Sequence, residues 1–573
     1  MSRHHEAHGS RPDSQLTGAE SLLLGLKRAG IDYLFANAGT DFPPIIEAFA
    51  TLDVDDVPTP VTVPHETASV AMAHGYYLVT GRPQAIMVHV NVGLANAAMG
   101  VINAASDDVP VVVMSGRTPI TERGRRGSRV TPIQYGQEMY DQSSIVADVV
   151  KFRYEMRYPE QGEILAARAV SLAMSEPRGP VYISLPREAL METIPAEIAI
   201  GAPVPPATAP HPDPAAIEEA ARLLSAARRP LILCQRGDPS GSVGALLASL
   251  AEKFAIPVVE PYSIRNVMPS HHPMLLGYDV KGPLAEADVV LVVDSGVPWM
   301  ESLHRPATET TVIQLGPDPH FRRMPIRGHK ADLAIACDTA VGLAALAEAM
   351  TPSPHAEERR ALYRQASERR RRDAAELAAQ GRSSPMSAEW MSRCISDIMD
   401  EQAIVFSELG VLPHMMDLKG PNRLFNNPHS GGLGWALPAA LGAQLADRER
   451  LVIACVGDGS YIFANPVACH QIAEALELPV LTIIKNNRMW NAVRRSVANS
   501  YPDGAAVKMN RMPLTSLEPS PDYTQIAAAS RAYVERVDHG DDFPAALERA
   551  VEVIRKERRQ AVLELNIAVS DKY

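Results

Sequence analysis

The stretch Val452-Ile453-Ala454-Cys455-Val456-Gly457-Asp458-Gly459-Ser460 decides the fold of this chain. Its apolar first half predicts a buried strand, which Gly457-Asp458-Gly459 ends abruptly. In α/β sheets ligands bind beyond the carboxyl ends of the strands, so this stretch puts a carboxylate at a ligand-binding edge. The two glycines let the backbone come close to a phosphate group. We therefore expect an α/β sheet with a ligand site directly after this strand.

Polar residues farther along the chain extend the same site. Asn465-Pro466 provides an N-cap and a first-turn proline for a helix, whose N-terminus we expect to point toward the same spot. The next predicted strand, 480–485, ends in Asn486-Asn487 and brings amide oxygens to this edge of the sheet. Carboxylate, amide and phosphate oxygens are ligands that Mg²⁺ accepts. A dinucleotide site is the weaker interpretation, because Ile462 stands where GxGxxG needs its third glycine.

Length and composition divide the chain around this site. The 573 residues suffice for three or four domains. We expect a linker rich in proline and alanine at 196–214, and a charged linker helix rather than an anion-binding site at 352–385. The other blocks alternate strands with amphipathic helices, which predicts parallel sheets. The prediction is a disordered tail (1–15) and three doubly wound α/β domains at 16–195, 215–351 and 386–573.

The expected elements can be placed by their periodicity and caps. In the first domain we expect helices at 17–28, 66–80 and 94–105. The expected strands are 33–36, 61–63, 85–90 and 110–115 in the first domain, 230–234, 255–259, 289–293 and 311–315 in the second, and 403–407, 451–456, 480–485 and 561–565 in the third.

Composition excludes several classes of protein. The hydrophobic fraction of 46% and the charged fraction of 21% are typical of globular proteins. No apolar run approaches the ~18 residues of a membrane span. A net charge of −12 argues against nucleic acid as a partner, and five scattered cysteines fit a reducing compartment. We expect a cytoplasmic protein with no nucleic-acid or membrane partner, whose polar start is not a signal peptide.

One signature points to a family. Gly457-Asp458-Gly459, followed after residues 460–485 by Asn486-Asn487, resembles the signature of thiamine diphosphate-dependent enzymes of the acetolactate synthase and benzoylformate decarboxylase superfamily. The resemblance implies a pyrimidine-binding, a central and a diphosphate-binding domain, in the order predicted above. It also implies thiamine diphosphate and Mg²⁺ as cofactors. A homodimer or homotetramer is implied too, in which the first domain of one subunit and the third of another enclose each cofactor.

The resemblance assigns roles in the third domain. It implies Asp458, Asn487 and the backbone carbonyl of Met489 as metal ligands. The segment 431–438 looks like the stretch beneath the cofactor, in which the carbonyl of Gly431 accepts from the aminopyrimidine and Leu433 forces a bent cofactor. By itself this segment is a glycine-rich turn into a helix. The implied cofactor-binding residues are Glu66, Gly431, Leu433, Gly457, Asp458, Gly459, Ser460, Asn487 and Met489.

Glu66 is the activating acid that the resemblance implies in the first domain. It follows a strand and opens an apolar helix, where by itself it is an ordinary first-turn acid favoured by the helix dipole. In the family, a carboxyl group that bonds the pyrimidine favours the tautomer that removes the reactive proton of the cofactor. The resemblance therefore makes Glu66 catalytic.

Other residues are candidates for contact with the substrate. His89, which follows the apolar run 85–88, resembles a histidine of benzoylformate decarboxylase, and Thr40 falls where the decarboxylases place a catalytic serine. His272 matches their middle-domain histidine, with a structural role equally open. Gln137, in Gln137-Glu138, resembles a residue that lines the channel of the synthases.

The segment after the asparagine pair has two further candidates. Trp490 would wall an apolar or aromatic substrate. Arg494 would hold a carboxylate, or would be a surface cation beside the loop 501–519. Both interpretations of Arg494 stay open at this point.

The leading hypothesis is a lyase that releases CO₂ from a 2-oxo acid or related carbonyl substrate, with carboligation as a further option. The alternatives within the family are an acetolactate synthase-type carboligase and a 2-hydroxyacyl-CoA lyase. The CoA phosphates of the latter would meet Arg123, Arg125, Arg126 and Arg129. A non-catalytic cofactor-binding protein is the alternative of another class, and the presence of Glu66, Asp458 and Asn487 together argues against it. The central block has no specific FAD signature.

Overall fold

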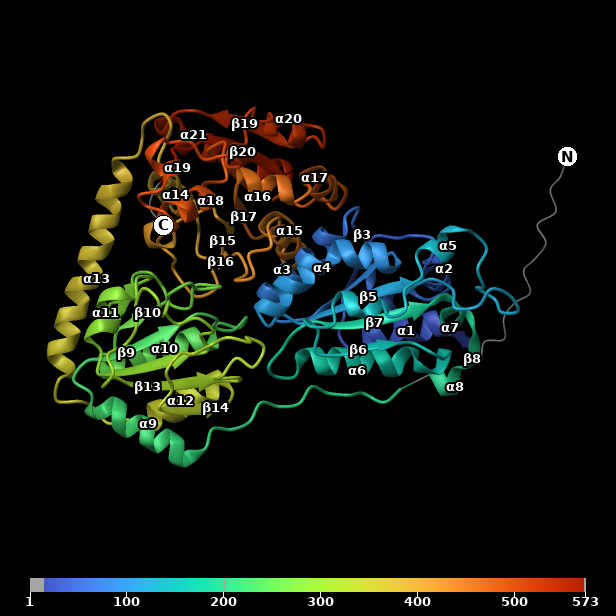
Figure 1. Ribbon diagram of the computed structural model, residues 1–573, viewed down its shortest axis with the longest axis horizontal. Helices are drawn as coiled ribbons and strands as arrows, with labels where there is room; N and C mark the ends of the chain where they lie inside the picture. The colour runs from blue at the N-terminus through green and yellow to red at the C-terminus, as the bar shows by residue number, and fades with distance from the viewer. Residues whose placement is uncertain (1–14, 200, 571–573) are drawn as a thin grey trace. The chain divides into compact units, whose positions relative to one another are not determined.

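The computed structural model describes residues 15–199 and 201–570, which form three six-stranded parallel sheets. The chain divides into two compact units. Unit 1 comprises 1–74 and 82–207 and contains the first sheet, and unit 2 comprises 75–81 and 208–573 and contains the central and third sheets (Figure 1). The predicted tail lies outside the described residues except for Gln15, which begins strand β1. The predicted fold class, three doubly wound parallel domains, is confirmed.

The first sheet has the strand order β3-β2-β4-β5-β7-β6. Its strands are β2 (Tyr33–Ala36), β3 (Thr59–Thr62), β4 (Gln84–Val88), β5 (Val111–Arg117), β6 (Arg153–Glu155) and β7 (Val181–Pro186), and a separate antiparallel pair joins β1 (Gln15–Thr17) to β8 (Thr193–Pro195). The helices are α1 (Gly18–Arg28), α2 (Pro43–Thr51), α3 (Glu66–Thr80), α4 (Val90–Ser106), α5 (Ile133–Gly136), α6 (Gly162–Met174), α7 (Arg187–Met191) and α8 (Ala196–Ala199). The predicted capping box at Thr17 and Glu20 begins α1.

The third sheet repeats this topology. Its order, β16-β15-β17-β18-β20-β19, places successive strands in the same positions as in the first sheet. The strands are β15 (Ile404–Glu408), β16 (Leu424–Asn426), β17 (Val452–Gly457), β18 (Leu481–Asn486), β19 (Tyr533–Val537) and β20 (Ala561–Asn566). The helices are α14 (Ala388–Asp397), α15 (Ala436–Ala446), α16 (Asp458–Phe463), α17 (Pro466–Ala475), α18 (Asn491–Ser500), α19 (Ala505–Lys508), α20 (Tyr523–Ala528) and α21 (Phe543–Glu557).

The central sheet has a different order, β11-β10-β9-β12-β13-β14. Alternate residues of its strands enter two different cores: Ile232 and Leu291 pack on one face of the sheet, and Leu231 and Val290 on the other. Because both faces are covered, these strands read as continuous apolar runs. The strands are β9 (Pro230–Cys234), β10 (Val258–Val259), β11 (Leu275–Gly277), β12 (Val289–Val293), β13 (Thr311–Gly316) and β14 (Leu333–Ala336), with helices α9 (Pro214–Ala226), α10 (Ser242–Phe254), α11 (Lys281–Glu286) and α12 (Thr339–Ala349).

A long helix, α13 (Ala356–Ala379), lies inside the predicted linker 352–385 and runs along the edge of unit 2 (Figure 1). Most of its side chains are exposed, but Arg359 is buried. Its guanidinium donates to the carbonyls of Ala227 and Phe254, at the ends of α9 and α10. These bonds satisfy carbonyls that a helix end leaves without partners, and they attach α13 to the central sheet.

Candidate active site

In both the first and the third sheet, the second strand in the chain lies on one side of the first strand and the third strand lies on the other. The strand order therefore reverses between the first and third strands. The reversal lies between β2 and β4 in unit 1, and between β15 and β17 in unit 2. Ligands of doubly wound sheets bind in the crevice that such a reversal opens at the carboxyl ends of the strands. The residues that follow these four strands are therefore the first place to look for chemistry.

In unit 1 this position holds His89, which directly follows β4 and caps α4. Its Nδ1 makes a short hydrogen bond with the buried carboxylate of Asp41, which lies in the loop after β2. Its Nε2 lies 3.1 Å from the side-chain nitrogen of Gln137. The hydrogen bond with Asp41 raises the pKa of His89, the negative charges of Asp41 and Glu66 act in the same direction, and burial opposes them.

Two glycines make room for this pair. A Cβ atom on Gly39 would lie 2.1 Å from Nδ1 of His89, and one on Gly116 would lie 1.7 Å from Oδ2 of Asp41. Val90, next to His89, has a φ of 35°, a conformation that strains a β-branched residue. Its N–H donates to Asp41 at 3.2 Å. Strained backbone held by a buried carboxylate is typical of functional sites.

Glu66 is buried at the same edge of the first sheet, in the group of side chains that we call the unit 1 half-site. Its two carboxyl oxygens accept from the side-chain amides of Asn37, at 2.9 Å, and Asn96, at 3.2 Å. Both carboxyl oxygens of this buried first-turn acid therefore have an amide donor. Thr40 lies exposed beside Asp41 in the loop after β2. Unit 1 therefore brings Glu66, His89, Thr40 and Gln137 to one edge of its sheet.

In unit 2 the reversal between β15 and β17 opens into a pocket of about 280 Å³. Its walls include the predicted residues Gly457, Asp458, Gly459, Ser460, Asn487, Met489 and Trp490. Asp458 is buried, and it accepts from the N–H groups of Gly459 at 2.9 Å and Arg488 at 2.7 Å. Burial raises the pKa of Asp458, and the backbone donors partly offset that rise. A cation bound at this carboxylate would stabilise its charge.

The two asparagines at the end of β18 point in different directions. Asn487 lines the pocket, and its side-chain oxygen accepts from Met489 N–H at 3.1 Å. Asn486 turns away and donates to Glu564 at 2.9 Å. Lys485 also lines the pocket and donates to the carbonyls of Leu409 and Gly410. Alternation along a strand explains why Asn487, and not Asn486, reaches the site.

The expected helix arrangement after β17 was wrong in one respect. Asn465 and Pro466 do begin a helix, α17, but neither lines the pocket. A short helix, α16, intervenes and begins at Asp458 itself. The bare backbone at Gly459 is required by packing, because a Cβ there would lie 2.2 Å from the ring of Trp490.

The donor set suits a magnesium diphosphate. No group of three or more His, Cys, Asp or Glu residues suitable for a metal occurs in 15–199 and 201–570, so a site made of protein acids alone is not present there. Asp458, Asn487 and Met489 instead offer one carboxylate, one amide and one backbone carbonyl in a single pocket. Mg²⁺ commonly takes few protein ligands and completes its octahedron with phosphate oxygens and water. The residues therefore fit the cofactor that the sequence signature implies.

Glu408, which sequence analysis missed, shapes the segment beneath this site. This wholly buried carboxylate at the end of β15 accepts from the N–H groups of Gly434, Trp435 and Ala436 at 2.7–2.8 Å. Burial raises its pKa, and these three bonds oppose the rise. The segment that holds Gly431 and Leu433 therefore has a fixed end. An acid at the end of an apolar strand, the feature that identified Asp458, was the available signal.

Two candidates, His272 and Arg494, do not line this pocket. His272 accepts from Met274 N–H at 3.2 Å, and its Nε2 lies 3.9 Å from Glu252, both in the central domain. Burial lowers its pKa, and the pocket walls do not include it. His272 therefore contacts residues of its own domain. Arg494 does not line the pocket either, but its neighbour Arg495 does. Trp490 lines the pocket and packs edge-on against Phe463, with 5.8 Å between the ring centroids.

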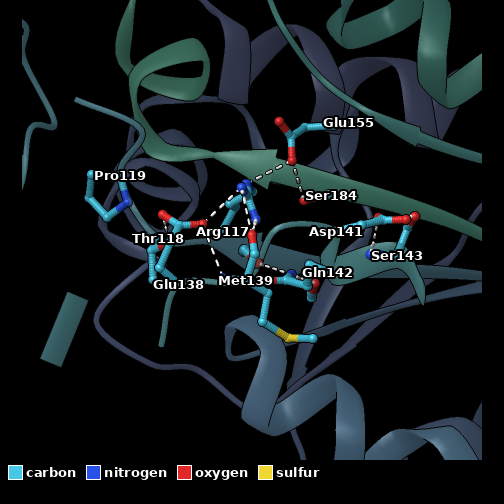
Figure 2. A network of polar contacts seen from close by, with 12 residues as sticks. Arg117, Thr118, Pro119, Glu138, Met139, Asp141, Gln142, Ser143, Glu155 and Ser184 are labelled. Atoms are coloured by element: carbon cyan, nitrogen blue, oxygen red, sulfur yellow. Dashed lines mark hydrogen bonds and ion pairs between the residues drawn. The ribbon is translucent and has the colours of Figure 1, made fainter. Parts of the chain in front are cut away.

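A short polar network supports the Gln137 side of the half-site in unit 1. Figure 2 shows the guanidinium of Arg117, the last residue of β5, between Glu138 and Glu155. The distances from guanidinium nitrogen to carboxylate oxygen are 2.8 Å on both sides. The network therefore fixes the residue that follows Gln137.

Along the parts of the chain that the structure describes, no helix combines the length and apolarity needed to cross a membrane.

Comparison with known proteins agrees with this geometry. Three family models of thiamine pyrophosphate enzymes match the chain: the N-terminal TPP-binding domain at 16–145, the central domain at 217–346 and the C-terminal TPP-binding domain at 409–565. The sequence is similar to benzoylformate decarboxylase of Pseudomonas aeruginosa, 27% identical over 82% of this chain and 85% of the relative. It is also similar to the acetolactate synthase isozyme 3 large subunit of Escherichia coli, 26% identical over 95% and 93%.

A solved structure shares the fold. The thiamine diphosphate-dependent 4-hydroxybenzoylformate decarboxylase of Rhodococcus jostii superposes with a TM-score of 0.76 at 23% identity, over 97% of this chain and all of that one. The two sheet-edge half-sites lie within the ranges that the TPP-binding models match. The chain therefore belongs to the thiamine pyrophosphate enzymes, in the superfamily of benzoylformate decarboxylase and acetolactate synthase.

Proposed function

We propose that this enzyme is a thiamine diphosphate- and Mg²⁺-dependent lyase that removes CO₂ from a 2-oxo acid. The observation that carries the proposal is His89, bonded to Asp41 on one ring nitrogen and facing Gln137 on the other, at the same sheet edge as Glu66. A decarboxylase must return a proton to its substrate after CO₂ has left. The hydrogen bond with Asp41 raises the pKa of His89, so this imidazole keeps such a proton to higher pH than an ordinary histidine does.

The candidate site residues of unit 1 have separate roles in this reaction. The bound cofactor supplies an electron sink for cleavage of the carbon–carbon bond. Glu66, fixed by Asn37 and Asn96, holds the pyrimidine by a hydrogen bond and controls its protonation. His89 gives its Nε2 proton to the substrate, and Asp41 orients the ring and stabilises its charge. Thr40 offers a hydroxyl from the adjacent loop.

The residues of unit 2 bind the metal and the diphosphate. We assign Asp458, Asn487 and the Met489 carbonyl to Mg²⁺, and the backbone of Gly457, Gly459 and Ser460 to the diphosphate. The Gly431 carbonyl and the Leu433 side chain would support the rest of the cofactor, in the segment that Glu408 fixes. Trp490 provides an apolar wall. His272 and Arg494 are left out, because neither lines the pocket and His272 contacts residues of the central domain.

The proposal also includes the assembly and the compartment. Glu66 and Asp458 belong to different units, and the family resemblance implies a homodimer or homotetramer in which such half-sites come from different subunits. All five cysteines are buried and free, which supports a reducing, cytoplasmic setting. Light scattering of the purified protein measures the subunit number directly.

A panel of substrates tests the reaction. Benzoylformate, pyruvate and straight-chain 2-oxo acids would be incubated with the protein, thiamine diphosphate and Mg²⁺, and CO₂ and aldehyde would be measured. We expect equal amounts of CO₂ and aldehyde from at least one 2-oxo acid, and neither product when the cofactor is omitted. Acetolactate-type products without free aldehyde would make the enzyme a carboligase. Cleavage of a 2-hydroxyacyl-CoA without CO₂ would make it an acyl-CoA lyase.

A further inference from the structure

Arg117 has an unusual density of contacts for a residue at the end of a strand. Its side chain is largely buried, and its Nε and Nη2 atoms lie 2.8 Å from Glu155 and Glu138. Nη1 and Nη2 also donate to the carbonyl of Met139, at 3.3 and 3.2 Å (Figure 2). The planar guanidinium can serve three acceptors at once, which a lysine ammonium cannot do in the same plane.

The segment 137–142 is fastened at further points. The second carboxyl oxygen of Glu138 accepts from the Thr118 hydroxyl at 2.9 Å and from Arg129. At the other end of the segment, Gln142 donates to the Ser115 hydroxyl at 2.7 Å and to the Gly116 carbonyl at 2.8 Å. Two of these anchors, Ser115 and Gly116, immediately precede Arg117 in β5. The end of β5 therefore holds this short segment along its length.

This segment presents Gln137 to His89. The side-chain nitrogen of Gln137 lies 3.1 Å from Nε2 of His89. Because Asp41 engages Nδ1, Nε2 is the ring nitrogen that remains for exchange of a proton. When Nδ1 carries the hydrogen, Nε2 accepts from the amide of Gln137, and when the ring is protonated, rotation of the amide offers its oxygen instead.

We propose that Arg117 is a positioning residue that holds Gln137 on Nε2 of His89 and thereby controls access to that nitrogen. The inference rests on the proposed function of His89 and deepens it. Arg117 does not touch the imidazole, so it acts through Glu138 and Met139, which follow Gln137 in the chain. The competing explanation is that Arg117 only neutralises Glu138 and Glu155 and supports the fold.

Chemical modification separates these explanations without relying on catalysis. Diethyl pyrocarbonate acylates neutral imidazole nitrogens that reagents can reach, and mass spectrometry of the peptide containing His89 gives the rate for that residue. We expect Arg117→Met and Gln137→Leu each to raise this rate several-fold, because in both variants Nε2 of His89 loses its contact with the Gln137 amide. We expect the double variant to be no faster than either single one, because both remove the same contact.

Controls keep the test sharp. Arg82 lies just before β4 in the same unit and forms an ion pair with Asp32. Arg82→Met should leave the modification rate of His89 unchanged. If Arg117→Met does not fold, Arg117→Lys carries the test: it keeps the charge but loses the fork, and should give an intermediate rate. A wild-type rate in the folded Arg117 variants, beside a raised rate in Gln137→Leu, would overturn the proposal. Because modification needs neither cofactor nor substrate, an inactive enzyme would leave this result readable.

Discussion

The imidazole of His89 is held on both sides, and each side has a separate physical effect. Asp41 contributes charge and a hydrogen bond, which favour the protonated ring and fix the hydrogen on Nδ1 in the neutral ring. Gln137 contributes an uncharged amide that suits either protonation state. A proton donor that must be recharged in each turnover benefits from both, because its geometry is kept while its charge changes.

Replacing Asp41 by Asn tests the electrostatic half of this arrangement. The imidazolium is the proton donor in our proposal, so kcat/KM should fall as pH rises through the His89 pKa. Asp41→Asn removes the charge that raises this pKa, which should return toward the ordinary value of about 6.5. The alkaline fall of kcat/KM should therefore move to lower pH.

The matched control for this variant is Asp32→Asn, which removes another ion-paired aspartate of unit 1, bonded to Arg82. It should leave the pH profile in place. An Asp41→Asn profile that coincides with the wild-type profile would show that His89 does not set it.

The contact of Asp41 with His89 could not be predicted from the sequence. His89, Glu66 and Asp458 could be proposed because each stands near the end of a predicted strand, beside other polar residues or glycines. Asp41 lies 48 positions from His89, and only the pairing of β2 with β4 brings the two together. The glycines Gly39 and Gly116 make room for the pair, but their purpose cannot be read before the register of the strands is known.

Single elements of unit 2 depend on buried acids that fasten the backbone. Glu408 binds three consecutive N–H groups where the segment 431–436 turns into α15. Gly431 and Gly434 adopt positive φ values of 71° and 87° in that turn, which glycine tolerates. The sequence predicts a glycine-rich turn before a helix here. It does not predict that Glu408 fixes the turn, because the hydrogen bonds join segments that are distant in the chain.

Glu408→Ala should loosen this turn. Three buried N–H groups would lose their acceptor, at about 1–3 kcal/mol for each buried group left unsatisfied. We expect a clearly lower midpoint of thermal unfolding and weaker binding of thiamine diphosphate, with a smaller effect for Glu408→Gln, which keeps one acceptor oxygen. Exposed Glu401→Ala, just before β15, is the control and should change neither quantity. Equal midpoints for Glu408→Ala and Glu401→Ala would contradict the role of Glu408.

In the whole molecule, the first and third sheets share one strand order, and both place candidate site residues where that order reverses. The rhythm of strands and helices predicted three parallel sheets, and strands such as β2, β9 and β12 fall at the expected residues. Short edge strands such as β6, β11 and β16 were missed, because three residues give too little periodicity. Strand order itself depends on long-range packing that the local pattern does not contain.

Metal binding connects the pocket of unit 2 to the cofactor-loaded state of the whole enzyme. Chelation of divalent cations should release thiamine diphosphate from the loaded enzyme. Asp458→Asn should weaken Mg²⁺-dependent cofactor binding, measured by calorimetry, by at least the 10–100-fold typical of residues that only support metal ligands. Exposed Asp538→Asn should bind like the wild type. Cofactor binding that is indifferent to chelator and to Asp458→Asn would rule out the proposed ligand set.

The catalytic role of Glu66 is tested by CO₂ release from a Glu66→Gln variant, measured with a 2-oxo acid that the wild type accepts and with saturating thiamine diphosphate and Mg²⁺. Cofactor binding is followed in the same samples by calorimetry. We expect CO₂ release to fall by about 10²–10⁴-fold, the range for loss of a general acid or base, while the cofactor still binds. Wild-type rates of CO₂ release in a cofactor-loaded Glu66→Gln variant would contradict this role.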